Sequence, residues 1–247
     1  MKYSFVIPYY NRVTLWNTLL SFDHFYKGRT DYEVLILEDK KNAEHPEWHP
    51  ALMEILRAYP QLPIVYRRMN YTNWSCPCST INDGVDIAKG EYVIMTNPEC
   101  MHYADVLKGF DEELAKGIAH PYIICGCMSV GCDVMKANTF EEYTYVANKW
   151  YQHSVHNPYH LNFCTLISKA DYIRIEGFNE EFDKGIGRAD VEFINLIGRS
   201  GFNIILRDDL LVLHQHHVES YPTERKHELV SINHSVTKGT SRFNKIL

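Results

Sequence analysis

Strand-like and helix-like segments alternate through the first hundred residues of this chain, and this order limits the folds that it can adopt. Short apolar runs are typical of buried strands, and longer segments with apolar residues on one side are typical of helices. Strands are predicted over 3–7, 31–39, 62–68 and 91–96, and helices over 14–26, 49–60 and 79–90. This pattern predicts an α/β fold whose mostly parallel sheet is covered by helices on both faces.

Open parallel sheets bind their ligands beyond the carboxyl ends of the strands. In this chain, polar and charged residues follow those ends at 8–12, 38–40, 67–70 and 97–99. We therefore expect a ligand, and a nucleotide in particular, at this edge of the sheet.

The second half of the chain has a less regular pattern. Helices are predicted over 103–114 and 191–199, and strands over 121–130, 203–206 and 210–213. Residues 140–160 have no clear period, and the polar residues 218–247 are expected to wrap the surface. No internal repeat or flexible linker separates the two halves, so residues 1–217 are predicted to form one domain.

Charge and cysteine content limit the partners and the compartment. The formal net charge of −6 argues against a nucleic-acid partner, which needs a basic face, but a few local groups can still hold a nucleotide. The residues that follow Lys2 are of strand type, so no secretory leader is expected. No apolar run approaches the ~20 residues that span a bilayer. Seven irregularly spaced cysteines are typical of reduced thiols. We expect a cytoplasmic protein without a transmembrane segment, and a peripheral contact with a membrane stays open.

Five segments, in this order along the chain, resemble the inverting glycosyltransferases of the GT-A fold (glycosyltransferase family 2-like). They are "SFVIPYYNR", "YEVLILED", "STINDGVDIAKGEYVIMTNPE", "IEGFNEEFDKGIGRADVEF" and "VLHQHH". The resemblance covers residues 3–217. It implies a nucleotide-sugar-binding half at 1–100, an acceptor and catalytic half at 101–217, and a C-terminal extension at 218–247.

The chain departs from the family pattern at three places. Asn97-Pro98-Glu99 stands where the family has Asp-x-Asp, and Ala189 replaces the first acid of the catalytic pair. Ile81, rather than a basic residue, precedes the helix asparagine Asn82.

The resemblance implies that the donor nucleotide is bound by residues from four of the expected strand ends or helices. Tyr10 is expected to stack on a uracil face, and Glu38 to accept a hydrogen bond from a ring N–H. A packed aromatic residue and a solvated strand end are the alternatives for these two. The full predicted set is Pro8, Tyr10, Arg12, Glu38, Asp39, Asn82 and Asn97.

The resemblance also implies a divalent cation, Mn²⁺ or Mg²⁺, that neutralises the departing diphosphate. Glu99 takes the place of the acid that is a direct ligand, His214 matches a late histidine of the family, and His216 is a further candidate. Mn²⁺ accepts imidazole as well as oxygen ligands. Asn97 can bond a ribose hydroxyl without adding charge. The alternative is a structural Asn-Pro turn with an exposed glutamate. His217 and His102 are further imidazoles nearby in sequence.

Asp190 aligns with the general base of the family, and Glu192 is a candidate helper. Asp190 is expected at the start of a helix, where the N-terminal dipole favours an ionised carboxylate. In an inverting transfer, this base would take the proton of the acceptor hydroxyl. A helix cap for Asp190 and a solvated helix face for Glu192 are the alternatives.

The segment 148–162 is crowded with aromatic residues and histidines, and the family places acceptor contacts there. Trp150 and Tyr151 are expected to stack on a sugar ring, and Asn162 to bond its hydroxyls. An irregular loop folded on its own aromatic residues is an equally good interpretation.

The leading hypothesis is an enzyme that moves a hexose or N-acetylhexosamine from a UDP-sugar to a glycan or another hydroxyl acceptor. A non-catalytic protein that binds a glycan or a nucleotide sugar is the main alternative, because Asn97 and Ala189 replace acids. A sugar nucleotidyltransferase is a lesser one, since "PYYNRVTLW" lacks the glycines of a triphosphate-binding loop.

Overall fold

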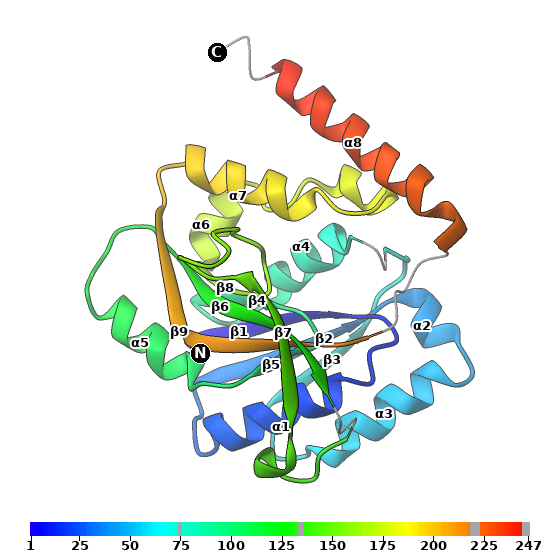
Figure 1. Cartoon of the computed structure of the whole chain (residues 1–247), viewed down its shortest axis with the longest axis vertical. Coiled ribbons are helices and arrows are strands. Elements are labelled where there is room, and N and C mark those ends of the chain that lie inside the picture. The colour runs from blue at the N-terminus through cyan, green and yellow to red at the C-terminus, as the bar shows by residue number, and fades with distance from the viewer. Residues whose placement is uncertain (74–75, 133–135, 218–222, 244–247) are drawn as a thin grey trace.

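A computed structural model of the chain describes residues 1–73, 76–132, 136–217 and 223–243. One sheet runs through the molecule in the order β3-β2-β1-β4-β8-β6-β9-β5, and β7 pairs with β6 beside this path. Helices lie above and below the sheet (Figure 1).

The first half of the chain forms the parallel part of the sheet. Strand β1 pairs in parallel with both β2 and β4, and β2 pairs in parallel with β3. All four carboxyl ends therefore lie at one edge of the sheet. The elements of this half are β1 (Tyr3–Tyr9), α1 (Leu15–Tyr26), β2 (Tyr32–Glu38), α2 (Lys40–Glu44), α3 (Trp48–Ala58), β3 (Ile64–Arg68), α4 (Cys78–Ile87) and β4 (Tyr92–Thr96).

The second half adds strands of both directions. Strands β8, β5 and β7 run against their neighbours, whereas β6 and β9 pair in parallel. The strands are β5 (Cys100–His102), β6 (Pro121–Cys132), β7 (Tyr145–Gln152), β8 (Cys164–Ser168) and β9 (Asn203–Gln215). The helices are α5 (Val106–Leu114), η1 (Phe140–Glu142), α6 (Lys169–Arg174), η2 (Glu180–Lys184), α7 (Ala189–Arg199), η3 (Thr223–Arg225) and α8 (Lys226–Phe243).

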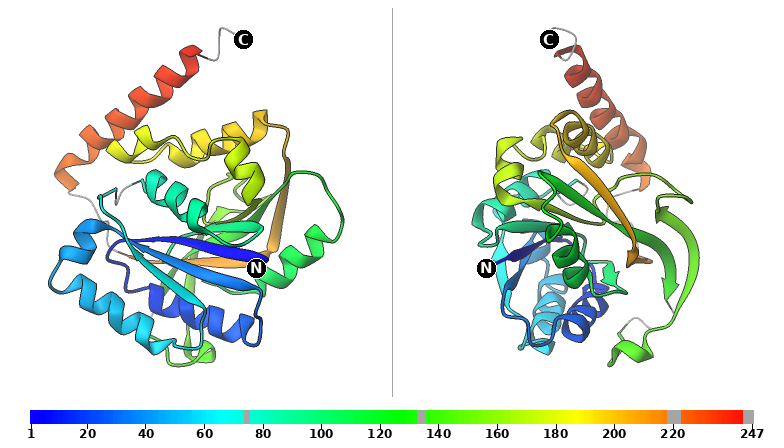
Figure 2. Two further views of the ribbon diagram at one scale, coloured as in Figure 1. Left: turned by 180° about the vertical axis from the view of Figure 1, so that it is seen from behind. Right: turned by 90° about the vertical axis from the view of Figure 1, so that its left-hand side faces the viewer.

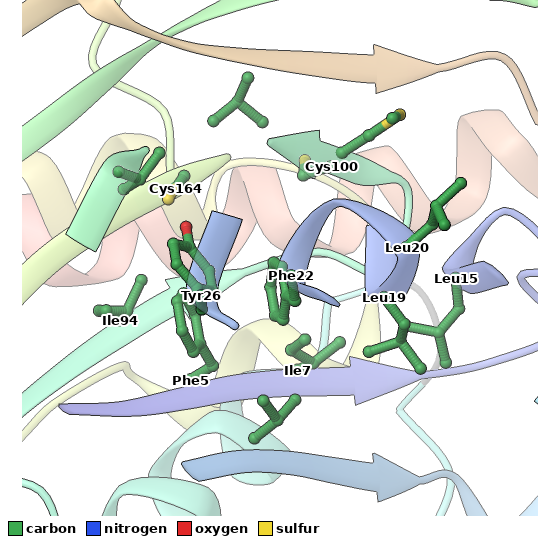
Figure 3. Close-up of a cluster of buried hydrophobic side chains, with 14 of the residues drawn as sticks. Phe5, Ile7, Leu15, Leu19, Leu20, Phe22, Tyr26, Ile94, Cys100 and Cys164 are labelled. Carbon is green, nitrogen blue, oxygen red and sulfur yellow. The ribbon is translucent and has the colours of Figure 1, made fainter. Parts of the chain in front are cut away.

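Two apolar layers hold the sheet between its helices. On one face, Phe5 of β1 packs 4.6 Å from Phe22 of α1 and 5.8 Å from Tyr26, measured between ring centroids (Figure 3). On the other face, Phe178 and Phe193 of α7 stack at 4.1 Å. Because β1 is buried on both faces, its sequence is apolar apart from Ser4 and does not alternate.

His102 is buried in the first of these layers. Its Nδ1 atom contacts the Tyr26 hydroxyl, its Nε2 atom lies 3.6 Å from the Cys164 Sγ atom, and its ring packs 4.7 Å from Phe22. Burial lowers the pKa of His102 from 6.5 to about 3, since a charged imidazole would lose its hydration. His102 is therefore a core residue.

We predict that this histidine makes the fold sensitive to acid. Between pH 6.5 and about 3, the unfolded chain binds a proton at His102 that the folded chain does not, so the free energy of unfolding falls as the pH falls. The loss is up to about 1.4 kcal/mol per pH unit. Urea unfolding of the parent and of His102→Phe from pH 7 to 4 measures it. Parallel stability curves for the two proteins would contradict the prediction.

The predicted α/β fold with a mostly parallel sheet is confirmed. Strand β7 lies within the stretch 140–160 that has no clear period, and β9 runs unbroken where two short strands are predicted. Helix α8 lies in the extension predicted to wrap the surface. It buries Leu229 and Asn233, one turn apart, so a polar residue interrupts its apolar stripe and hides the helical period. Residues 218–222 and 244–247 of this extension lie outside the described residues.

Every cysteine side chain that the structure describes is a buried free thiol, as expected for reduced cysteines. Across the described residues, no helix combines the length and the apolar character needed to cross a bilayer.

Candidate functional site

A cleft of about 230 Å³ opens at the carboxyl edge of the parallel strands, where the sequence predicts a ligand. The loops after β1, β2 and β4 form one side, and the start of α7 forms the other. Eight predicted site residues line it: Pro8, Tyr10, Arg12, Asp39, Asn97, Glu99, Asn162 and Asp190.

Glu99, His214 and His217 form a compact group at this cleft. The Glu99 Oε1 atom lies 3.6 Å from Nε2 of His214 and 3.4 Å from Nε2 of His217. One ligand atom from each residue lies within 4.8 Å of the others. Two atoms held about 2.1–2.2 Å from one ion lie roughly 3–3.6 Å apart, so these spacings fit a common cation.

The surroundings of Glu99 favour its ionised form. Burial raises the pKa of this carboxyl, but the two imidazoles and the nearby Arg12 guanidinium outweigh burial and hold it well below its usual range. Arg12 Nε lies 3.6 Å from the Glu99 Oε2 atom. This oxygen is buried and has no hydrogen-bond partner among the described residues. A buried polar atom without a hydrogen bond is compatible with a bound ion beside it.

The donor set fits Mn²⁺ better than Mg²⁺. Mg²⁺ prefers a shell of oxygen atoms, whereas Mn²⁺ also accepts imidazole nitrogen. With one carboxylate and two imidazoles, the group Glu99–His214–His217 fits the more tolerant ion.

Strand pairing brings the group together from distant parts of the sequence. Cys100 of β5 lies opposite His214 of β9, and the Gln215 amide donates to the Glu99 carbonyl at 3.0 Å. The exposed His216, predicted as a ligand, lies outside the group, and its amide donates to Val130 of β6. His217, rather than the predicted His216, is the second histidine of the group.

Tyr10 and Asp39 also line the cleft. The Tyr10 ring meets Trp48 edge-on at 5.4 Å, and Trp48 stacks on His45 at 3.8 Å. Asp39 accepts from the backbone N–H groups of Lys41 and Asn73. Burial raises the pKa of Asp39, and these bonds oppose the rise.

Glu38 does not line the cleft, although it precedes Asp39. Its carboxylate is fully buried and accepts from Asn42, His49 Nδ1 at 2.9 Å and Tyr66. Glu38 is the last residue of β2, whereas Asp39 is the N-cap of α2, so the two carboxylates leave the backbone from different local structures.

Asp190 lies in the first turn of α7, at the opposite wall of the cleft. Its Oδ1 atom accepts from Asn162 Nδ2 at 3.0 Å. The Asn162 Oδ1 atom accepts from the buried Tyr122 hydroxyl at 2.5 Å, and this bond fixes which end of the amide faces Asp190. Asp190 is exposed to solvent at the cleft, but the protein packed around its carboxylate raises its pKa, and the bond from Asn162 opposes the rise.

Two other predicted residues lie outside the cleft. Glu192 borders a separate groove and faces Arg199, with 3.4 Å between Oε1 and Nη2. Asn82 fastens the turn before η2, because its Oδ1 atom accepts from the Phe178 amide and the Tyr172 hydroxyl. We find no contact of either residue with the groups around Glu99 or Asp190 in the part of the chain that the structure describes.

The predicted acceptor residues lie at different places relative to the Glu99–His214–His217 group. Tyr151 stacks on Phe163 at 5.3 Å and meets His214 edge-on at 5.0 Å, so it borders the cluster. Trp150 points elsewhere and packs 4.4 Å from His153. Asn162, predicted to bind acceptor hydroxyls, instead bonds the Asp190 carboxylate.

No protein-family model matches the chain, and no curated protein matches its sequence. Solved structures do resemble it. S. aureus TarS 1–349 in complex with UDP-GlcNAc has 15% identity and a TM-score of 0.66 over 93% of this chain and 64% of that chain. The mannosyltransferase PcManGT from Pyrobaculum calidifontis, in complex with GDP-Man and Mn²⁺, has 14% identity and a TM-score of 0.61 over 92% and 59%.

The fold is that of the GT-A glycosyltransferases. The chain spans about three fifths of the length of these two structures. At this identity the likeness establishes the fold, and the site must be argued from its own residues.

Proposed function

We propose that this protein transfers a sugar from a nucleoside diphosphate sugar, with UDP as the expected nucleotide, to a hydroxyl group of an acceptor. One observation carries the proposal. Glu99, the buried member of the candidate cation-binding group Glu99–His214–His217, lines the same cleft as Asp190, whose carboxylate accepts a hydrogen bond from the Asn162 amide. Sugar transfer needs both parts, one for the diphosphate and one for the proton.

At the nucleotide end, Tyr10 offers a flat face to the base, and Asp39 is the acid that faces the cleft. We assign to Asp39 the hydrogen bond with the ring N–H that the sequence assigned to Glu38. Asn97 would bond a ribose hydroxyl. Arg12, at the rim of the metal group, would face the diphosphate.

Glu99, His214 and His217 would hold a Mn²⁺ ion. When bound, this ion supplies positive charge that stabilises the diphosphate as a leaving group. Arg12 adds a second positive charge from the chain itself. Water is partly excluded because Glu99 is only 8% exposed, and charge interactions are stronger where water is excluded.

At the other end, Asp190 would accept the proton of the acceptor hydroxyl as the oxygen attacks the anomeric carbon. The bond from Asn162 to Oδ1 leaves Oδ2 to face the acceptor. A base on the face opposite to the leaving group gives inversion in one displacement. Tyr151 is the aromatic residue best placed to contact an acceptor sugar, because it borders His214.

The neighbours support a nucleotide sugar as donor, because the printed complexes hold UDP-GlcNAc and GDP-Man. They differ in the base and in the sugar. A hexose and an N-acetylhexosamine both stay open, and the acceptor is proposed only as a glycan or another hydroxyl compound.

We predict that UDP binds more tightly with Mn²⁺ than with a chelator. The cation would offset the repulsion between the diphosphate and the Glu99 carboxylate. Calorimetric titration of the parent with UDP and with GDP, each in Mn²⁺ and in EDTA, measures this effect and the choice of base. Equal UDP affinity in both conditions would contradict a metal-dependent donor site.

A non-catalytic protein of the same fold is the second candidate, and Ala189 favours it. Ala189 lines the cleft and packs in the apolar layer with Phe178 and Phe193, so position 189 offers no carboxylate where the family has its first acid. Release of UDP from a UDP-sugar distinguishes the two candidates, because a binding protein would hold the donor unchanged.

A further inference from the structure

Helix α8 packs against the loop that leads into the candidate base, Asp190. It lies outside the layer of α4 and α7 and contacts η2 (Figure 2). Two of its residues, Leu229 and Asn233, are buried one turn apart, on the side that contacts residues 182–187. The last of these residues, Gly187, lines the cleft.

Asn233 makes the central contact. Its side chain is fully buried, and its Nδ2 atom donates to the carbonyl of Phe182 at 3.0 Å and to the carbonyl of Gly187 at 2.8 Å. The same atom lies 3.6 Å from the sulfur of Cys76, another residue of the cleft wall. A buried amide costs free energy unless it is bonded, and the two carbonyls satisfy the Nδ2 end of Asn233. Its Oδ1 atom is buried without a hydrogen-bond partner among the described residues, so the contacts of Asn233 with the loop are all made through Nδ2.

Three further contacts join the helix to the loop. The Ile186 amide donates to the Leu229 carbonyl at 3.1 Å, and Arg188 Nη2 lies 2.9 Å from His234 Nδ1. A Cβ atom on Gly185 would lie 2.4 Å from the Leu229 carbonyl oxygen. The helix therefore approaches as closely as a glycine permits.

The loop has a backbone conformation that needs such support. Gly187 and Arg188 both have φ of 70°, in the left-handed region, which is unfavourable for arginine. Such conformations persist where the surrounding structure fixes them. Arg188 is the N-cap of α7, so its backbone angles set the direction in which Ala189 and Asp190 leave the loop.

We propose that α8 is a positioning element for the base, and that Asn233 is its main positioning residue. This inference rests on the proposed role of Asp190. Asn233 acts through the loop 185–188 and does not itself line the cleft. Asn162 fixes the carboxylate from within the cleft, and α8 fixes the backbone that carries it.

The test compares Asn233→Ala with Ser231→Ala, a control on the exposed side of the same helix. For Asn233→Ala, we expect kcat for UDP release from UDP-GlcNAc in Mn²⁺ to fall by about ten-fold, because small displacements of a reacting group are costly. UDP affinity should stay within about two-fold, since Tyr10, Asp39 and the metal group are unchanged. Amide hydrogen exchange should become faster over residues 185–192 and stay unchanged in β1 and β2. The control should match the parent in all three measurements.

The exchange measurement separates this proposal from the proposed function. A parent that releases no UDP would reject UDP-GlcNAc as the donor, and exchange would still decide whether α8 holds the loop. Unchanged exchange over 185–192 in Asn233→Ala would overturn the proposal, and so would an equal fall in kcat and UDP affinity. If Asn233→Ala does not fold, His234→Ala removes only the contact with Arg188. Faster exchange confined to the loop would support the proposal, and parent-like exchange would overturn it.

Discussion

Replacement of Asp190 by asparagine is expected to lower the rate of sugar transfer by about 10²–10⁴-fold, the usual effect of losing one general base. Asparagine keeps the size of the side chain, and its carbonyl can still accept from Asn162 Nδ2. It cannot take the proton of the acceptor hydroxyl. UDP affinity should hardly change, because the nucleotide end of the cleft is built from other residues.

Glu192→Gln is the matched control. Glu192 lies on the same helix, two residues further, but it borders a different groove and faces Arg199. Single-turnover transfer from a UDP-sugar and UDP titration should be measured for both variants. Parent-like turnover of Asp190→Asn would reject Asp190 as the base, and loss of both activity and UDP binding would indicate a structural cap.

The surroundings of Asp190 also change the pKa of its carboxyl group. Desolvation raises the pKa of Asp190, and the bond from Asn162 opposes this rise. Ala189 takes the place of the neighbouring acid, so no like charge at position 189 adds to this rise. A raised pKa makes the carboxylate a stronger base, which suits the proposed role.

The edge of the sheet that carries the site could be predicted because it depends on strand order alone. Because these strands are parallel neighbours, the turns after Tyr9, Glu38 and Thr96 lie side by side. That reasoning brought Tyr10, Asp39 and Glu99 into one cleft before any contact was known.

The choice between adjacent residues could not be predicted in the same way. Glu38 and Asp39 stand at a strand end, and only the structure tells which of them is the buried one. His214 and His216 would share a face if the strand continued. Because β9 ends at Gln215, the alternation stops there, and His217 joins His214 instead.

Long-range side-chain bonds were also beyond the sequence. Asn162 ends the segment 148–162, which is crowded with aromatic residues and histidines, and nothing local indicates that Tyr122 and Asp190 are its partners. The role of α8 is hidden for a similar reason. Asn233 occupies a buried position that the helical pattern would assign to an apolar residue.

The structure suggests how an Asn-Pro-Glu turn can replace Asp-x-Asp. Asn97 removes one negative charge from the site, and the remaining acid, Glu99, is buried between two imidazoles and Arg12. The nitrogen ligands of His214 and His217 would make up the number of donors. The site would then hold its cation with fewer negative charges, and Arg12 would share the neutralisation of the diphosphate.

Glu99→Gln tests this arrangement, because its effect on UDP binding should change sign with the metal. In Mn²⁺, the affinity for UDP should fall by about 10–100-fold, as is typical when a residue around a bound metal is replaced. In EDTA, the variant should bind UDP at least as well as the parent, because a buried negative charge no longer faces the diphosphate and Arg12 is released from its partner. Calorimetric titration of the parent and of Glu99→Gln with UDP, in Mn²⁺ and in EDTA, measures this change of sign.

The histidines complete the test with a matched pair. His217→Ala should lose most of the Mn²⁺-dependent gain in UDP affinity, because it removes one imidazole of the group. His216→Ala should keep it, because that side chain is exposed and lies outside the group. If the two variants behave alike, or if Glu99→Gln weakens UDP binding equally with and without metal, the Glu99–His214–His217 group is not the cation site. The same pair decides between the two neighbouring histidines that the sequence alone could not separate.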